Sequence, residues 1–170
     1  MANFTTIAEG LEIGPALAEV AALPDYCWLE TDAGKGATLS LLDHAGIPIM
    51  RDELPETWRL IGQVRAILAA GHDDAGRLSY CRVGRMPPGA GLPPHHDGID
   101  GIIERRYQLA LQSAAGVALT IDGETRCPRP GDLWRIAAHR THSVWNHSPV
   151  DRITLLFDTR ADCSRPKNAP

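Results

Sequence analysis

Two histidines and one aspartate in this sequence have the spacing that a metal ion requires. His95 and Asp97 form an H-x-D element within the segment Leu92–Gly98. Side chains two residues apart in an extended segment point the same way, so both can face one ion. His142 lies at the start of a predicted strand farther along the chain and would supply a second imidazole. The sequence therefore predicts that these three residues bind a metal.

Two imidazoles and one carboxylate on one face of an ion leave three octahedral positions open. This arrangement suits non-haem iron(II), which must bind a co-substrate and dioxygen together. An H-x-D triplet alone is weak evidence, because such triplets occur by chance and zinc accepts the same ligands. Residues downstream of the triplet must therefore decide the chemistry.

Arg152 is the most informative of these downstream residues. It lies ten residues after the second metal-binding histidine, inside the apolar segment Asp151–Asp158. An arginine buried there without a partner would be costly. A ligand carboxylate would supply the partner through two parallel hydrogen bonds, and Thr154 on the same face can donate another. The alternative is an exposed strand edge on which Arg152 pairs with Asp151 or Asp158. The metal-binding pattern upstream favours the ligand role.

The other histidines fit a metal site less well. His96 points away from its neighbour His95 if the segment is extended, so we expect it outside the ligand set. The remaining four lie in predicted loops or turns: His44, His72, His139 and His147. The last two flank the ligand His142 and rank below it.

The elements that must position these residues are mostly short strands. From residue 79 onward the hydrophobic pattern has a period of two, and turn signals rich in proline and glycine interrupt it. Short strands at such spacing are typical of a sandwich or barrel, whose ligands bind at its mouth. The predicted strands are Tyr80–Arg85, Arg106–Gln112, Val117–Ile121, Asp132–Ile136, His142–Trp145 and Arg152–Phe157.

The first half of the chain holds the predicted helix, Glu53–Ala70. Pro55 lies near its start, where proline is tolerated, and Gly71 follows its last periodic residue. The segment Ala37–Ile49 is predicted to form one or two short strands around a turn at Asp43–Gly46. The expected fold class is therefore mainly β with a flanking helix (α+β), a jelly roll on which the helix packs.

The size and composition are those of one globular domain. The chain has 170 residues, 44% of them hydrophobic and 22% charged. We expect a single domain over residues 1–170, with its core at 37–158 and a flexible tail at 159–170. The net charge of −4 gives no basic field, so nucleic acid is not an expected partner. No apolar stretch approaches the roughly 20 residues of a membrane span.

The cysteines and the N-terminus bear on location. The four cysteines are scattered and form no C-x-x-C pair, so neither a thiolate zinc site nor a redox pair is expected. The first ten residues carry Glu9 and lack the features of a secretory signal. We expect reduced thiols and a cytoplasmic protein.

Five blocks, taken in order, resemble the aspartyl/asparaginyl β-hydroxylase family, and together they cover about Tyr80 to Asp158. The blocks are Arg82–His95, Arg106–Leu111, Gly131–Arg135, His142–Asn146 and Arg152–Asp158. The resemblance implies a cupin-like double-stranded β-helix that binds Fe(II). It implies 2-oxoglutarate as co-substrate with O2, hydroxylation of an amino acid or of an amino-acid side chain in a peptide, and release of succinate and carbon dioxide.

Residue by residue, the resemblance implies the following roles. His95 and His142 fall on the metal-binding histidines of the family, and Arg152 falls on the arginine that binds the C5 carboxylate of 2-oxoglutarate. Arg106 and Gln108 fall where the family places polar residues toward the co-substrate, although the family often has histidine at the second position.

The substrate stays open. Animal peptide hydroxylases of the family lack the ligating carboxylate, so the presence of Asp97 is more similar to bacterial members that act on free amino acids or biosynthetic peptides. The oligomeric state is equally open. Four arginines could meet a substrate carboxylate: Arg51, Arg82, Arg85 and Arg105.

Two functions from other classes are alternatives. One is a cupin-like metal dioxygenase or isomerase that does not use 2-oxoglutarate, and such chemistry does not require a buried Arg152. The other is a non-catalytic ligand-binding jelly roll. The complete set of His95, Asp97 and His142 favours an enzyme over such a module.

Overall fold

Two antiparallel sheets and two α-helices make up the described part of the computed structural model, residues 2–31, 35–43, 46–71, 77–97 and 105–160. The larger sheet has the strand order β1-β9-β6-β11-β4-β3-β2. The smaller sheet has the order β5-β10-β7-β8. In chain order the strands are β1 (Phe4–Ala8), β2 (Leu29–Glu30), β3 (Ala37–Ser40), β4 (Arg77–Met86), β5 (Gly91–His95), β6 (Arg105–Gln112), β7 (Val117–Ile121), β8 (Glu124–Arg126), β9 (Leu133–Ile136), β10 (His142–Asn146) and β11 (Arg152–Arg160).

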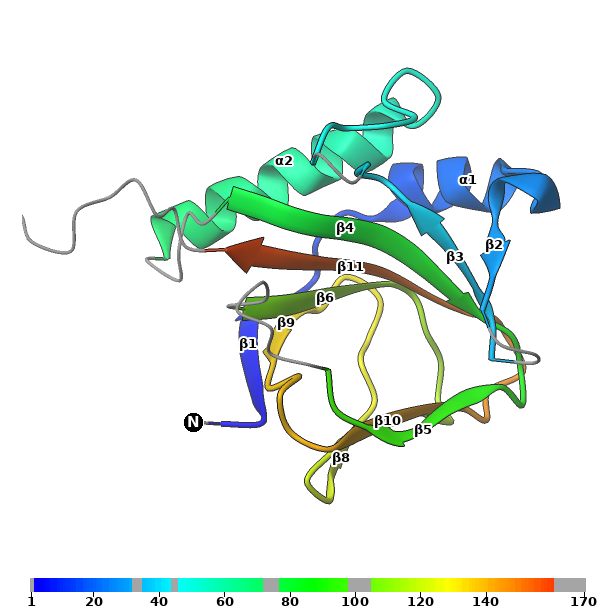
Figure 1. Ribbon diagram of the computed structural model, residues 1–170, viewed down its shortest axis with the longest axis vertical. Coiled ribbons are helices and arrows are strands. Elements are labelled where there is room, and N and C mark those ends of the chain that lie inside the picture. Colours follow the sequence, from blue (N-terminus) through cyan, green and yellow to red (C-terminus); the bar gives the residue numbers. More distant parts are fainter. Residues whose placement is uncertain (1, 32–34, 44–45, 72–76, 98–104, 161–170) are drawn as a thin grey trace, which may run out of the picture.

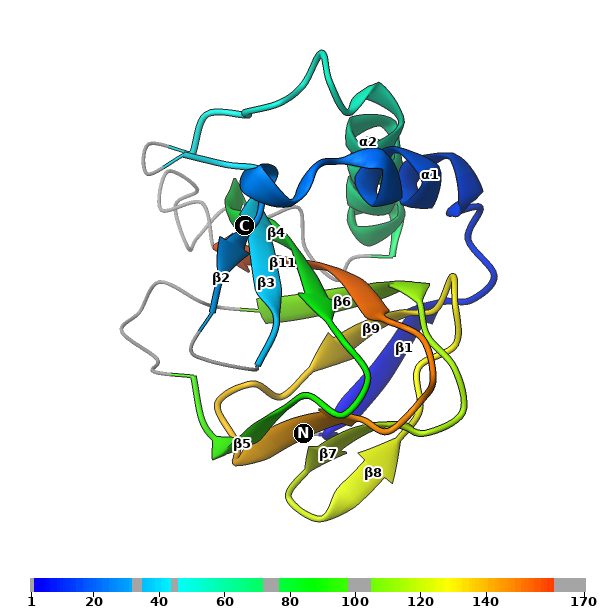
Figure 2. The ribbon, with the colours of Figure 1, turned by 90° about the vertical axis from the view of Figure 1, so that its right-hand side faces the viewer.

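The molecule has three layers. Helices α1 (Gly14–Ala22) and α2 (Pro55–Ala70) cover the outer face of the larger sheet (Figure 1). Figure 2 shows the smaller sheet facing the opposite side of the larger one. A single-turn 3-10 helix, Asp25–Cys27, leads into β2. This arrangement leaves a space between the two sheets whose lining depends on which side chains point inward.

Alternation along the central strand β11 separates the two faces of the larger sheet. Ile153, Leu155 and Phe157 point outward into a core shared with α1 and α2, and each is at most 5% exposed. Thr154 and Leu156 point inward and line the space between the sheets. Because alternate residues of a strand point to opposite faces, β11 places apolar side chains on its outer face and can carry polar side chains on its inner face. A second apolar cluster, which includes Leu119, joins the sheets beside that space.

The strands and the helix predicted from the sequence are present, and the mainly β jelly roll is confirmed. All six predicted strands lie within three residues of the observed bounds, and α2 begins two residues later than predicted. The first predicted segment forms β3 and an isolated bridge between Leu42 and Pro48. The predicted turn there includes residues 44–45, which lie outside the described part.

The structure extends the fold beyond the expected core of residues 37–158. Strand β1 pairs with β9, and Phe4 packs edge-on against Trp134. Helix α1 adds Val20 to the outer core. Strand β11 continues through Thr159, which is 3% exposed, so the expected tail cannot begin at that residue. Residues 161–170 lie outside the described part. Among the described helices, none has both the length and the apolar character needed to cross a membrane.

Candidate metal and co-substrate site

Strand pairing brings the three predicted metal ligands together. His95 at the end of β5 and His142 at the start of β10 are register partners on neighbouring strands of the smaller sheet, and their ring centroids are 4.3 Å apart. Asp97 follows two residues later, anchored by its backbone N–H, which donates to the carbonyl of Ala138 at 3.1 Å. One ligand atom from each of the three side chains lies within 4.8 Å of the others. The donor set of two imidazoles and a carboxylate fits the predicted iron(II).

Both imidazoles are held in the form that a metal ligand needs. The Nδ1 of His95 lies 2.7 Å from the carbonyl of Pro93, and the Nδ1 of His142 lies 2.9 Å from the carbonyl of Arg140. A carbonyl only accepts, so each Nδ1 must carry a hydrogen, which leaves Nε2 as the nitrogen that can offer a lone pair to a metal. Burial lowers the pKa of His142, which favours its neutral, metal-binding form.

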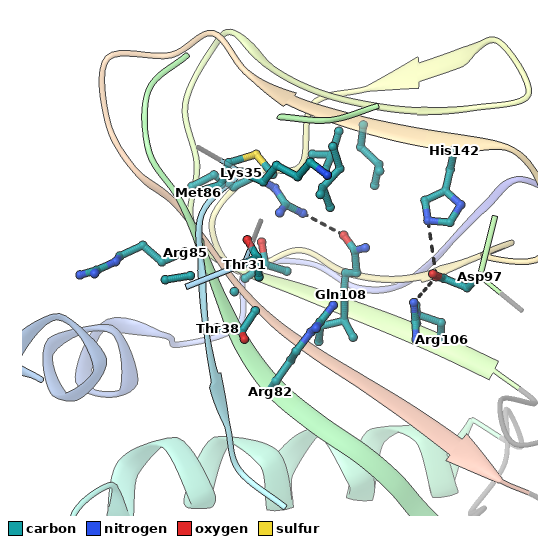
Figure 3. A pocket seen from close by; sticks show the side chains of 18 of the residues that line it. Thr31, Lys35, Thr38, Arg82, Arg85, Met86, Asp97, Arg106, Gln108 and His142 are labelled. Atoms are coloured by element: carbon teal, nitrogen blue, oxygen red, sulfur yellow. Dashed lines mark hydrogen bonds and ion pairs between the residues drawn. The ribbon is translucent and has the colours of Figure 1, made fainter. Parts of the chain in front are cut away.

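The ligands open into a cavity between the two sheets. Its apolar wall includes Met86, Leu119, Val144 and Leu156, and its polar lining includes all of the predicted site residues. Three further polar side chains line it from the region of β2 and β3: Thr31, Lys35 and Thr38 (Figure 3). Sequence reasoning missed these three because no motif marks the N-terminal half.

Arg152 lies at the other end of the cavity with its charge unbalanced. It is 7% exposed, and one Nη2–H donates to Oε1 of Gln108 at 3.0 Å. Its Nε and the Oγ1 of Thr154 are both buried, and neither has a hydrogen-bond partner within the described residues. Burial lowers the pKa of Arg152 to about 10, and no carboxylate contributes to the shift. The alternative of a solvent-exposed arginine paired with Asp151 or Asp158 is therefore wrong.

Arg106 has two carboxylate partners. Its Nε and Nη2 donate to the two oxygens of Asp158 at 2.8 and 2.7 Å, and its Nη1 donates to Asp97. Sequence reasoning considered Asp158 only as a partner of Arg152. The choice between the two arginines depends on strand register, which places Arg106 on β6 directly opposite Asp158 on β11.

The other histidines lie apart from the site where the structure describes them. His96, His139 and His147 are exposed, and none lines the cavity. His44 and His72 fall outside the described residues.

Comparison with known protein families identifies the family to which the chain belongs. The model of the aspartyl/asparaginyl beta-hydroxylase family matches residues 34–162. The chain belongs to this family. The matched range includes the three predicted metal ligands and the buried arginine. The match confirms the predicted enzyme class, an Fe(II)- and 2-oxoglutarate-dependent oxygenase that uses O2. None of the curated protein sequences compared with the chain matches it significantly.

Solved structures with the same fold are distant in sequence. An oxidoreductase of the 2OG-Fe(II) oxygenase family from Burkholderia pseudomallei is 15% identical with a TM-score of 0.66, over 94% of this chain and 89% of its own. The viral collagen prolyl hydroxylase of Paramecium bursaria Chlorella virus-1 is 12% identical with a TM-score of 0.65, over 95% and 97%. A Trichoplax adhaerens prolyl hydroxylase is 13% identical with a TM-score of 0.69, over 92% and 83%. These likenesses confirm the cupin-like double-stranded β-helix.

Proposed function

We propose that this chain hydroxylates an amino acid, free or within a peptide, with iron(II) held by His95, Asp97 and His142 and 2-oxoglutarate held by Arg152 and Thr154. One observation carries the assignment of the co-substrate. A buried guanidinium N–H and a buried hydroxyl, both without partners among the described residues, lie in the same cavity as the three metal ligands. A dicarboxylate spanning the cavity would satisfy both groups.

Iron(II), 2-oxoglutarate and dioxygen together supply the oxidising power that breaks an unactivated C–H bond. The protein residues bind and orient. The two histidines present Nε2 lone pairs because backbone carbonyls hold their Nδ1–H groups. Gln108 accepts a hydrogen bond from Arg152 and so restrains the guanidinium that would receive the distal carboxylate. The apolar wall, Leu119 and Val144 among it, excludes water and strengthens these polar contacts.

The arginines of the cavity point to a substrate that carries a carboxylate. Arg82 lines the cavity, stacks over the ring of Tyr80 at 5.1 Å, and forms no ion pair with a described carboxylate. Arg82 and Gln108 flank Leu156 on either side, so Arg82 lies between the co-substrate end and the metal end. Arg85 also lines the cavity, but its side chain points away from the other labelled side chains (Figure 3) and pairs with Asp25 at 3.0 Å. We assign the substrate carboxylate to Arg82.

The other two candidate arginines are less suitable. Arg51 is exposed, and neither it nor Arg105 lines the cavity. The Trichoplax adhaerens relative was solved with a peptide fragment, which supports a cavity mouth able to accept a residue within a peptide. The cytoplasmic location remains a prediction that cell fractionation tests.

Anaerobic spectroscopy tests the assignment of both ligands. Iron(II) and 2-oxoglutarate added to the purified protein should give a weak visible charge-transfer band that neither shows alone. His142→Ala and Arg152→Ala should abolish it, whereas the matched controls His139→Ala and Arg126→Ala, at exposed positions outside the cavity, should keep it. A folded, metal-loaded wild type without the band would contradict the use of 2-oxoglutarate and favour another metal-dependent jelly-roll chemistry.

Steady-state kinetics test the role of Arg82. A screen by succinate release should select carboxylate-bearing amino acids or peptides over their amides and esters. Arg82→Gln should raise KM for the selected substrate at least tenfold, because a charge-assisted pair is lost, and should leave the affinity for 2-oxoglutarate unchanged. Arg85→Gln is the control, since its partner is Asp25. An unchanged KM in Arg82→Gln would overturn the assignment.

A further inference from the structure

Three charged side chains, of which Asp158 and Arg106 are buried, form a connected series that ends at the candidate metal site. Asp158, 1% exposed, accepts two parallel hydrogen bonds from Arg106, which is 9% exposed. The third arm of the same guanidinium donates to Oδ2 of Asp97, and that oxygen lies 3.5 Å from Nε2 of His142. Figure 3 shows the part of this series that faces the cavity, with Asp97 between Arg106 and His142.

The parallel hydrogen bonds fix the direction of the third arm. Asp158 occupies Nε and Nη2 together, so the plane of the guanidinium cannot rotate and Nη1 is left aimed at Asp97. Both residues of the pair lie on central strands, β6 and β11, where the backbone is held on both sides. The pair of Arg106 and Asp158 therefore lies in one of the most rigid parts of the larger sheet.

Asp97 itself has little other support within the described residues. It lies beyond the end of β5, one backbone hydrogen bond anchors it, and its side chain is 25% exposed. A carboxylate in that position can adopt several rotamers, of which few direct an oxygen toward His142. Contact with Arg106 selects one of them.

Charge balance gives Asp158 a second effect. A lone guanidinium beside Asp97 would compete with a metal cation for the same carboxylate. Because Asp158 balances the charge of Arg106, the set of Asp158, Arg106 and Asp97 keeps one net negative charge for the metal.

We propose that Arg106 and Asp158 are positioning residues that hold the Asp97 carboxylate toward His142 and preserve its charge for iron. This inference rests on the proposed function, which makes Asp97 a metal ligand. Asp158 touches none of the three ligand side chains, yet its removal should weaken the metal site. Positions that support a metal ligand in this way typically contribute 10- to 100-fold to affinity.

Metal titration without 2-oxoglutarate tests the proposal, because its readout is independent of turnover. Mn(II) affinity, measured anaerobically by calorimetry, should fall roughly 10- to 100-fold in Asp158→Asn, a change that keeps the shape of the side chain. Asp132→Asn is the matched control: this aspartate is also buried, at 7% exposed, but its carboxylate accepts the backbone N–H of Arg129 and does not line the cavity. The control should lower the melting temperature and leave the Mn(II) affinity unchanged.

A second variant covers the case in which Asp158→Asn leaves Arg106 unbalanced and unfolds the protein. Arg106→Gln with Asp158→Asn removes both charges together, and the same loss of affinity is expected. Wild-type affinity in a folded variant would overturn the proposal. An affinity loss in Asp97→Asn with none in Asp158→Asn would overturn this inference alone. Wild-type Mn(II) affinity in Asp97→Asn would overturn the assignment of Asp97 as a metal ligand as well. A missing charge-transfer band in the spectroscopic experiment would instead contradict the 2-oxoglutarate part of the proposed function.

Discussion

The positive charge of Arg152 illustrates how the site is built at the expense of stability. Burial lowers the pKa of this guanidinium to about 10, and its Nε lacks a partner among the described residues. A shift of that size corresponds to a few kcal/mol of unfavourable desolvation in the ligand-free protein. The same desolvation is what makes a carboxylate ligand bind strongly there.

We therefore predict that Arg152→Met stabilises the ligand-free protein. Methionine fills the space of the arginine stem without a buried charge, so the free energy of unfolding should rise by about 1–3 kcal/mol. The stabilisation by 2-oxoglutarate should disappear at the same time. Urea denaturation with and without 2-oxoglutarate and Mn(II) measures both effects, and a destabilised ligand-free Arg152→Met would contradict the unbalanced charge.

The pH dependence of stability should reflect His142. Burial lowers its pKa in the folded protein, so below the usual value of about 6.5 the unfolded chain binds the proton more readily. The metal-free protein should then be fully stable above that pH and lose stability as the pH falls through the folded-state pKa. Denaturation between pH 5 and 8 measures the slope, which should be smaller in His142→Gln. Equal slopes in the two proteins would contradict the lowered pKa.

Individual site residues were partly predictable from the sequence. His95, Asp97 and His142 followed from residue type and spacing, and Arg152 followed from the cost of a charge in an apolar strand. The pairing of Arg106 with Asp158 did not follow, because two arginines compete for this aspartate and only strand register decides between them. Because Asp158 pairs with Arg106, no described carboxylate balances the charge of Arg152.

At the scale of elements, α1 supports α2 through one carboxylate. Glu19 on α1 accepts the backbone N–H groups of Glu56 and Thr57, at 2.7 and 2.8 Å, and the Thr57 hydroxyl at 3.0 Å. These N–H groups belong to the first turn of α2 and have no acceptor within the helix, and the N-cap residue Leu54 has no side chain that could cap them. A neighbouring helix therefore caps α2.

Glu19→Ala should lower the free energy of unfolding by about 1–2 kcal/mol, because the first turn of α2 loses its acceptor and its negative charge. Thermal or chemical denaturation measures the loss. Glu9→Ala, at an exposed position, is the matched control and should change stability little. A Glu19→Ala protein as stable as this control would show that water replaces the carboxylate.

Elements differed in how well the sequence revealed them. The helix α2 was predicted because it is long and periodic, and the strands that carry the site alternate clearly. Helix α1 was missed because it has nine residues, of which only Ala16 and Val20 are buried. Strand β1 was missed because its five residues pair at the edge of the sheet and only Phe4 is buried. Short elements that gain stability from distant partners carry little local signal.

At the scale of the molecule, the two halves of the site come from different sheets. The histidines of the candidate metal site lie on β5 and β10 of the smaller sheet, and Arg152 lies on β11 of the larger one. A ligand that contacts both halves links the two layers. Binding of the metal and the co-substrate together should therefore stabilise the folded protein beyond what its apolar cores provide.

We predict that Mn(II) and 2-oxoglutarate together raise the melting temperature far more than 2-oxoglutarate alone. At one hundred times the dissociation constant the gain is about 2.7 kcal/mol, or roughly 5–10 °C for a chain of this size. Glutarate, which lacks the 2-oxo group, is the control and should give a smaller shift in the presence of the metal. Equal shifts for the two diacids would contradict binding of the oxo acid at the metal.

Strand β5 lies at the edge of the smaller sheet and, among the described strands, pairs with β10 alone. Pro93 and Pro94 within it have no N–H to donate, so few hydrogen bonds oppose its separation. Amide exchange should accordingly be fast in β5 and slow in β11, which is paired on both sides. Because His95, a proposed metal ligand, is the last residue of β5, local opening of this strand would release it without global unfolding. We therefore predict that the residence time of iron depends on the opening rate of this edge strand, and that hydrogen bonding along β5 determines how long the enzyme stays loaded.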